Sequence, residues 1–175
     1  MGGQIIQNIY NILKLYMNNA LPINLVGNRM EDIYNFLKLS DSIATAGQPT
    51  KEQFTAISES GYQVVVNLAL PESLNALPDE KEVVETQGME YIHIPVVWEN
   101  PTIDDIRCFF SVMEANADKN IFVHCAANMR VSAFMYLYRL IHEGMSDEDA
   151  KRDLHQIWIP NDNWQKFIEQ VIQYQ

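Results

Sequence analysis

Apolar residues recur with helical spacing in the first part of the chain. Between residues 4 and 19 they occupy one face, while asparagine, glutamine and lysine side chains occupy the other. This pattern predicts an amphipathic helix, which we expect to pack on its own domain. After a turn at 22–28, a second short helix is expected over about 30–38.

From residue 41 onward, short apolar runs alternate with longer amphipathic segments. The clearest run is Val64-Val65-Val66, whose consecutive β-branched residues are typical of a buried parallel strand. The predicted strands cover 42–47, 63–70, 90–96 and 121–124, and the predicted helices cover 50–60, 78–87, 102–116, 130–143, 146–158 and 162–174. The alternation predicts an α/β fold with three layers, a mostly parallel sheet of four to five strands and helices on both faces.

Several helix ends carry recognisable signals. Thr50 with Gln53 and Thr102 with Asp105 have the spacing of capping pairs. Gly88 is expected to end the acidic helix at 78–87, which should lie at the surface. The helix at 130–143 is apolar around most of its circumference, so we expect it to be central and buried.

The length favours a single domain. A chain of 175 residues is long enough to bury one sizeable hydrophobic core. We expect one domain over residues 1–175, in which 1–39 is a helical extension packed on a core at 40–145 and 146–175 forms C-terminal helices.

The composition narrows the possible partners. A net charge of −11 would repel nucleic-acid phosphates, so we expect no nucleic-acid partner. The sequence contains no apolar run of about 18 residues, so we expect no membrane partner either. Two cysteines are too few for a disulfide framework, so we expect a reducing, cytoplasmic location. Any anion site on so acidic a protein must be built locally, from backbone amides and well-placed cations.

One segment combines the features of such a site. An apolar strand at 121–124 leads into Cys125, and a helix begins near Arg130. Successive N–H groups at a helix N-terminus form a natural anion site, and a thiolate there is stabilised by the same donors. Arg130 adds a planar fork suited to phosphoryl oxygens. The predicted phosphate-binding residues are Ala126, Ala127, Asn128, Met129 and Arg130, with Asn128 able to adopt the left-handed conformation that such a loop requires.

The segment and its surroundings resemble the cysteine-dependent phosphatase superfamily, and in particular its dual-specificity-like branch. The likeness is carried by the loop at 124–130, by Ala46-Gly47-Gln48-Pro49-Thr50, by the segment at 61–68 and by Tyr91-Ile92-His93-Ile94-Pro95-Val96. It covers roughly residues 40–145. The chain looks most similar to a small bacterial group related to the phosphatase-like domain found beside β-lactamase-like hydrolases.

The resemblance implies the chemistry of a phosphatase. Cys125 would attack phosphorus and form a phosphocysteine, which water then hydrolyses. His124 would tune the loop, and Ser132 would support it. The implied substrate is phosphotyrosine or another phosphate monoester, with no metal or other cofactor. The sequence does not predict an oligomeric state.

The loop also departs from the commonest phosphatase signature. Only four residues separate Cys125 from Arg130, Val131 replaces the usual Ser or Thr after the arginine, and no glycine lies in the loop. Two alternatives therefore stay open. One is a phosphate-binding module without turnover, and the other is a rhodanese-like sulfurtransferase that carries a persulfide on Cys125.

A general acid is expected on the loop that follows the strand at 90–96. This loop contains no Asp, so Glu99 is the first candidate to protonate the leaving group. Asp104 and Asp105 are alternatives, although acids in the first turn of a helix are common for dipole and capping reasons.

Overall fold

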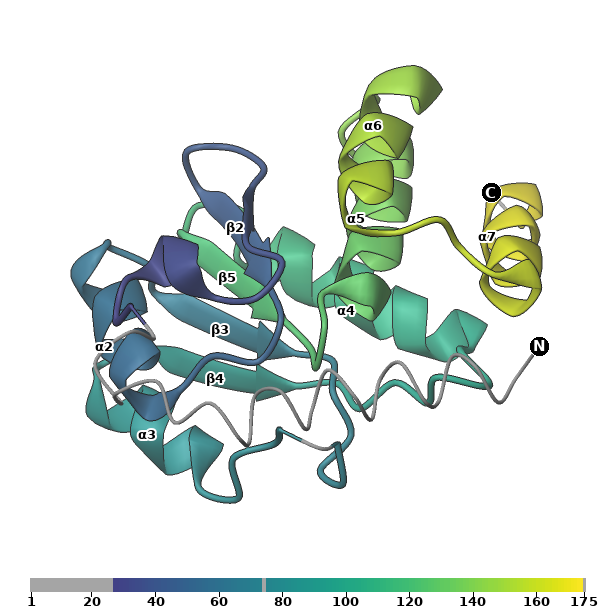
Figure 1. The fold of residues 1–175 in the computed structure, drawn as a ribbon. Coiled ribbons are helices and arrows are strands. Elements are labelled where there is room, and N and C mark those ends of the chain that lie inside the picture. Colours follow the sequence, from purple (N-terminus) through teal and green to yellow (C-terminus); the bar gives the residue numbers. More distant parts are fainter. Residues whose placement is uncertain (1–26, 74, 175) are drawn as a thin grey trace.

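The computed structural model describes residues 27–73 and 75–174, and it contains a five-stranded sheet (Figure 1). The strands are β1 (Leu37–Lys38), β2 (Ile43–Ala46), β3 (Val64–Asn67), β4 (Glu90–His93) and β5 (Ile121–His124). Their order across the sheet is β1-β2-β5-β3-β4. Only β1 runs antiparallel to its neighbour, and the remaining pairs are parallel. The predicted α/β fold is confirmed.

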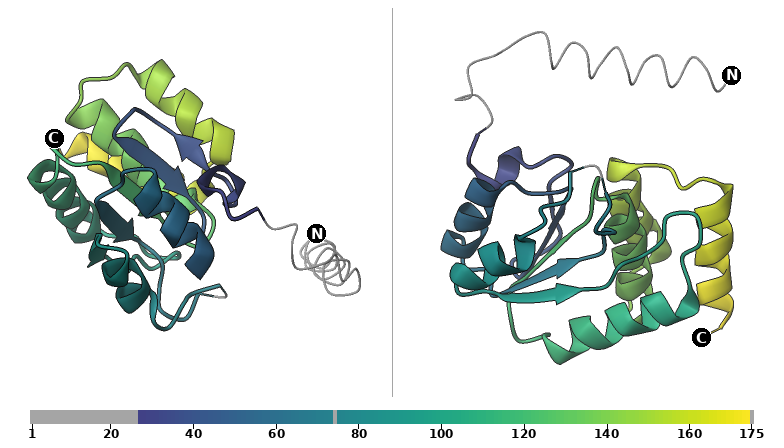
Figure 2. Two further views of the ribbon diagram at one scale, coloured as in Figure 1. Left: turned by 90° about the vertical axis from the view of Figure 1, so that its left-hand side faces the viewer. Right: turned by 90° about the horizontal axis from the view of Figure 1, so that it is seen from below.

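Helices cover both faces of the sheet, as two further views make plain (Figure 2). One face carries the 3₁₀ turn η1 (Met30–Asp32), α2 (Lys51–Glu59) and α3 (Glu80–Thr86), and the other carries α4 (Ile103–Ala115), α5 (Met129–Ile141), α6 (Asp147–Ile157) and α7 (Asp162–Gln173). None of the helices in the described part of the chain combines the length and hydrophobicity needed to cross a bilayer.

Alternation along the central strands divides the interior into two cores. Val64 and Val66 of β3 belong to the core under α4 and α5. Val65 and Phe122 point the other way, into the core under α2 and α3. Because every residue of β3 and β5 is buried, both strands read as continuous apolar runs in the sequence, as parallel strands between two layers do.

Helix α5 occupies the centre of the larger core. Residues 130–138 are all buried, which confirms the prediction for this helix. Phe134 is fully buried, with its ring 5.5 Å from that of Phe109, 5.8 Å from that of Phe167 and 6.1 Å from that of Trp164. One side chain thus joins α4, α5 and α7.

The predicted helix caps are present. Thr50 with Gln53 and Thr102 with Asp105 form complete capping boxes at the starts of α2 and α4. Gly88 follows α3 with φ +80°, a conformation that disfavours residues with a Cβ. These local signals were readable because each depends on a few neighbouring residues.

The helix predicted over 30–38 is wrong, and the helix predicted over 4–19 lies outside the described residues. Only residues 30–32 form a helical turn, and 37–38 form strand β1. Asn35 has a left-handed φ of 52°, which stops a right-handed helix, and Leu37 and Lys38 then pair with Thr45 and Ala44 of β2.

The parallel register brings four strand ends to one edge. Ala46 of β2 and Asn67 of β3 both lie opposite His124 of β5, and His93 of β4 lies opposite Asn67. Ligands of open α/β sheets bind beyond the carboxyl ends of the strands. Cys125 follows His124 directly, so it lies at this edge.

We predict that Phe134→Ala lowers the free energy of unfolding by about 3–5 kcal/mol, because it leaves a cavity where three elements meet. Urea denaturation measures the change, with Ile172→Ala as a control because Ile172 is 40% exposed. A Phe134→Ala loss no larger than that of the control would show that this contact is not central to the core.

Candidate active site

The two cysteines lie in different environments. Cys125 follows β5 and is only 1% exposed, with its N–H 3.4 Å from the carbonyl oxygen of Ala46. Cys108, on α4, is exposed and lies away from the apolar stripe of that helix. Only Cys125 therefore lies at the carboxyl edge of the sheet.

The loop after Cys125 turns its carbonyl groups away from its own centre. The carbonyl of Ala126 accepts from the N–H of Gln48 at 3.3 Å, and that of Ala127 accepts from Asn35 Nδ2 at 3.0 Å. The carbonyl of Met129 accepts from Trp158 Nε1 at 3.1 Å. Three separate segments thus hold three carbonyls of this short loop.

This arrangement fixes the direction of the loop amides. In a planar trans peptide the N–H of the next residue points opposite to the carbonyl. The N–H groups of Ala127 and Arg130 therefore point away from Gln48 and Trp158. Within residues 27–73 and 75–174, no acceptor is hydrogen-bonded to the N–H of Ala126, Ala127, Met129 or Arg130. Unpaired amides at the start of α5 are what an anion site requires.

Two asparagines, Asn35 and Asn128, tie the loop to the segment before β1, because each side chain donates a hydrogen bond to a backbone carbonyl in the other's segment. Asn128 is completely buried with φ 63°, which confirms the left-handed conformation expected of it. Its Nδ2 donates to the carbonyl of Asn35 at 2.7 Å and to Thr45 Oγ1 at 3.0 Å. Asn35 in turn donates to Ala127. The loop is thereby tied to the chain before β1 and to β2.

Arg130 is a buried cation that has no carboxylate partner among residues 27–73 and 75–174. It is 8% exposed, and its Nε has no hydrogen-bond partner in the described part of the chain. The arginine ion pairs among those residues belong to Arg29, Arg107, Arg139 and Arg152. The guanidinium carbon of Arg130 lies 5.8 Å from the centre of the Trp98 ring. Burying an unpaired charge is costly, so this position favours an anionic ligand.

The loop that carries Glu99 lies beside this arginine. Trp98, which contacts Arg130, directly precedes Glu99, and the carbonyl of Glu99 accepts from Asn163 Nδ2 at 3.1 Å. The Glu99 side chain is exposed. Asp105 is occupied in its capping box, and Asp104 is 94% exposed and 3.7 Å from Arg107.

A buried polar cluster lies behind the loop. His124 is completely buried, and its Nε2 lies 3.2 Å from Oε1 of Glu80, which is 4% exposed. The contact does not have the geometry of a hydrogen bond. Gln48 Nε2 and Asn67 Nδ2 donate to the two carboxylate oxygens of Glu80, and Asn67 also reaches the Tyr91 hydroxyl.

This cluster shifts the ionisation of its members. Burial in itself opposes the charge on Glu80, but contacts with His124, Gln48 and Tyr91 outweigh it and lower the pKa of Glu80 below 4.5. Burial, followed by the nearby Glu80 carboxylate, raises the pKa of Tyr91. Glu80 is therefore a buried carboxylate on a helix whose other acids, Glu82 and Glu85, are exposed as expected of a surface helix.

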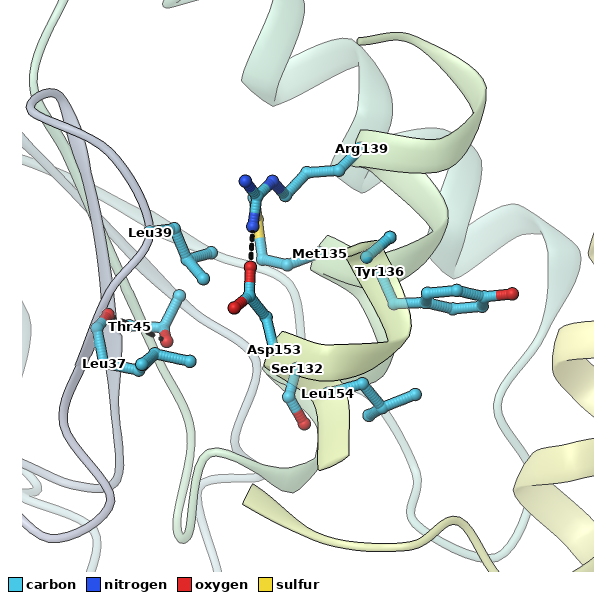
Figure 3. Close-up of a pocket in the computed structure, with 10 residues that line it drawn as sticks. Leu37, Leu39, Thr45, Ser132, Met135, Tyr136, Arg139, Asp153 and Leu154 are labelled. Carbon is cyan, nitrogen blue, oxygen red and sulfur yellow. Dashed lines mark hydrogen bonds and ion pairs between the residues drawn. The ribbon is translucent and has the colours of Figure 1, made fainter. Parts of the chain in front are cut away.

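Ser132 faces a different part of the molecule. Its Oγ donates to the carbonyl of Met129 at 2.9 Å and lies 3.1 Å from Trp158 Nε1. It lines a water-sized cavity of about 10 Å³ between β1, β2, α5 and α6, where Arg139 pairs with Asp153 (Figure 3). The cavity is too small for a substrate, and no described residue donates a hydrogen bond to the Cys125 sulfur.

Several residues around the loop carry no sequence signal. Asn35 lies between two aromatic residues in a segment that resembles a helix, and Glu80 is one acid among many. Trp158 and Trp164 reach the site only because α6 and α7 fold back towards it. Gln48 is the exception, because it belongs to the Gly-Gln-Pro block.

Solved structures of other proteins are similar to this fold. A DUF442 protein from Shewanella putrefaciens CN-32 is 32% identical, with a TM-score of 0.75 over 83% of this chain and 95% of its own. The core catalytic domain of the PP-IP phosphatase SIW14 from S. cerevisiae is 16% identical, with a TM-score of 0.66 over 78% of this chain and 85% of its own, so it shares the fold alone.

Sequence comparison adds two findings. The "Beta-lactamase hydrolase-like protein" of Agrobacterium fabrum is 30% identical over 97 residues, which are 54% of this chain and 22% of that protein. The chain thus spans less than a third of the length of this relative. A family model described as "DSP-PTPase phosphatase fused to NAD+ Kinase" matches residues 24–168. Because this match covers most of the sequence, the chain belongs to the DSP-PTPase phosphatase family that the model represents.

Proposed function

We propose that this protein hydrolyses phosphate monoesters, phosphotyrosine among them, through a phosphocysteine intermediate on Cys125. The observation that carries the proposal is the buried Arg130, which has no carboxylate partner in the described residues and lies at the start of a helix whose first amides are unpaired. A phosphoryl group supplies the negative charge and the acceptor oxygens that these groups need.

In the first step the Cys125 thiolate attacks phosphorus. An S–P bond forms while the bond from phosphorus to the leaving oxygen breaks, and Glu99 gives its proton to that oxygen. The amides of residues 126–130 and the Arg130 guanidinium bind the equatorial oxygens. Removing one such donor typically slows the reaction by about 10²–10³-fold.

In the second step water attacks phosphorus and the S–P bond breaks. Glu99, now a carboxylate, takes a proton from the water, and Cys125 leaves as a thiolate. Inorganic phosphate is released, and no metal or other cofactor takes part.

Glu99 is a better candidate for the general acid and base than Asp104 or Asp105. Its neighbour Trp98 touches Arg130, whereas Asp105 is held by the helix cap that it completes. Asp104 lies near Arg107 on the exposed face of α4. The Glu80–His124 pair supports the loop from the opposite side and cannot reach the leaving group, because both side chains are enclosed by the protein.

We expect Cys125→Ser to lower the hydrolysis of para-nitrophenyl phosphate by roughly 10³-fold or more, because the nucleophile is lost. Cys108→Ser, which replaces an exposed cysteine, should leave the rate unchanged. A rapid quench followed by mass spectrometry should show a phosphoryl group on the Cys125 peptide of the wild type.

Two results would speak for the other functions. Release of thiocyanate from thiosulfate and cyanide, dependent on Cys125 and without phosphatase activity, would indicate sulfur transfer. Inactivity of the wild type towards every phosphate ester, together with stabilisation by phosphate, would indicate a binding module.

We expect Glu80→Gln to destabilise the protein by about 1–3 kcal/mol at neutral pH, because it removes a buried charge that His124, Gln48 and Asn67 surround. Since the folded state lowers the pKa of Glu80, the stabilisation is complete above about pH 4.5 and is lost as the pH falls through the lowered value. The wild type and the variant should therefore converge in acid.

Thermal denaturation as a function of pH measures this effect. Glu82→Gln, an exposed position on the same helix, provides the matched control and should follow the wild type throughout. A Glu80→Gln deficit that stays constant from neutral pH to pH 3 would refute the electrostatic role.

A further inference from the structure

The segment between α6 and α7 is hydrogen-bonded to both the Glu99 loop and the phosphate-binding loop. This segment, residues Trp158–Trp164, begins where α6 ends and includes the first turn of α7. In Figure 1 it is the yellow coil that connects α6 with α7, together with the start of α7. Neither its tryptophans nor its asparagines belong to the residues assigned to the chemistry above.

Two consecutive carbonyls of the Glu99 loop are held by this segment. Trp164 Nε1 donates to the carbonyl of Trp98 at 3.0 Å, and Asn163 Nδ2 donates to the carbonyl of Glu99 at 3.1 Å. Trp164 is fully buried and its backbone N–H is capped by Asn161, so the donors stand on a fixed helix start. The plane and direction of the Trp98–Glu99 backbone are thereby set from α7.

The same segment also contacts the phosphate loop. Trp158 Nε1 donates to the carbonyl of Met129, while its ring centre lies 5.2 Å from that of Trp98. Trp98 is also 5.2 Å from Trp164 and lies over Arg130. One continuous set of contacts therefore joins the Glu99 loop, the C-terminal helices and the anion-binding loop.

We propose that Asn163 and Trp164 are positioning residues that hold Glu99 where it protonates the leaving oxygen. This inference rests on the proposed phosphatase function and extends it to the C-terminal helices. Since an exposed Glu99 side chain has no hydrogen bond of its own among the described residues, its placement depends on the backbone that carries it. Loosening that backbone costs acid catalysis while leaving nucleophilic attack intact.

The test compares kcat/KM for esters whose leaving groups differ in their need for a proton, because kcat/KM reports formation of the phosphocysteine and not the later step in which Glu99 acts as a base. Asn163→Ala removes one donor, and Trp164→Phe keeps an aromatic ring while removing the N–H. Hydrolysis of phenyl phosphate, whose leaving group needs protonation, should fall by about 10- to 100-fold. Hydrolysis of 2,4-dinitrophenyl phosphate, whose leaving group departs without a proton, should change less than about threefold.

Two further variants sharpen the test. Gln165→Ala, an exposed position on the same turn of α7, should behave like the wild type towards both esters. Glu99→Gln should give the same selective loss on phenyl phosphate. Adding Asn163→Ala to it should lower that rate little further, because both changes remove the same function, the protonation of the leaving oxygen. Melting temperatures confirm that each variant is folded.

The outcomes separate this inference from the function on which it rests. Equal losses on both esters in Asn163→Ala, or full additivity with Glu99→Gln, would overturn the positioning role while leaving the phosphatase assignment intact. No Cys125-dependent hydrolysis of dinitrophenyl phosphate by the wild type would overturn the assignment itself, and the positioning role with it.

Discussion

The site is organised around a buried guanidinium that has no carboxylate partner in the part of the chain that the structure describes. Arg130 lies in the first turn of the central helix α5, and the ring of Trp98 beside it offers a face and no formal charge. The unpaired N–H groups at the same helix start also carry partial positive charge. In a protein of net charge −11, a buried cation and unpaired amides thus lie together at the carboxyl edge of the sheet.

The loop keeps its shape because its outward-facing atoms are bonded to the rest of the fold. Three distant parts of the chain each donate a hydrogen bond to one loop carbonyl, through Gln48, Asn35 and Trp158. Such a loop needs no glycine, since its one left-handed position is occupied by an asparagine whose amide is itself bonded in the interior. The departures from the common phosphatase signature are therefore compatible with a preorganised anion site.

Much of this could be predicted from sequence, because the relevant signals are local. The β-branched run of β3, the capping boxes and the left-handed Asn128 each depend on a few adjacent residues. Strand β1 could not be predicted in this way, because its two residues are a strand only by pairing with β2. The same holds for Glu80 and Trp164, whose roles depend on partners far away in the sequence.

The account is tested most directly by the binding of inorganic phosphate to the Cys125→Ser protein, in which no chemistry can follow. Calorimetric titration should show a single site, and adding Arg130→Ala should weaken binding by roughly 10- to 100-fold, the usual value of a charge-assisted hydrogen bond. Absence of binding, or equal affinity with and without the guanidinium, would contradict the claim that Arg130 and the loop amides form an anion site.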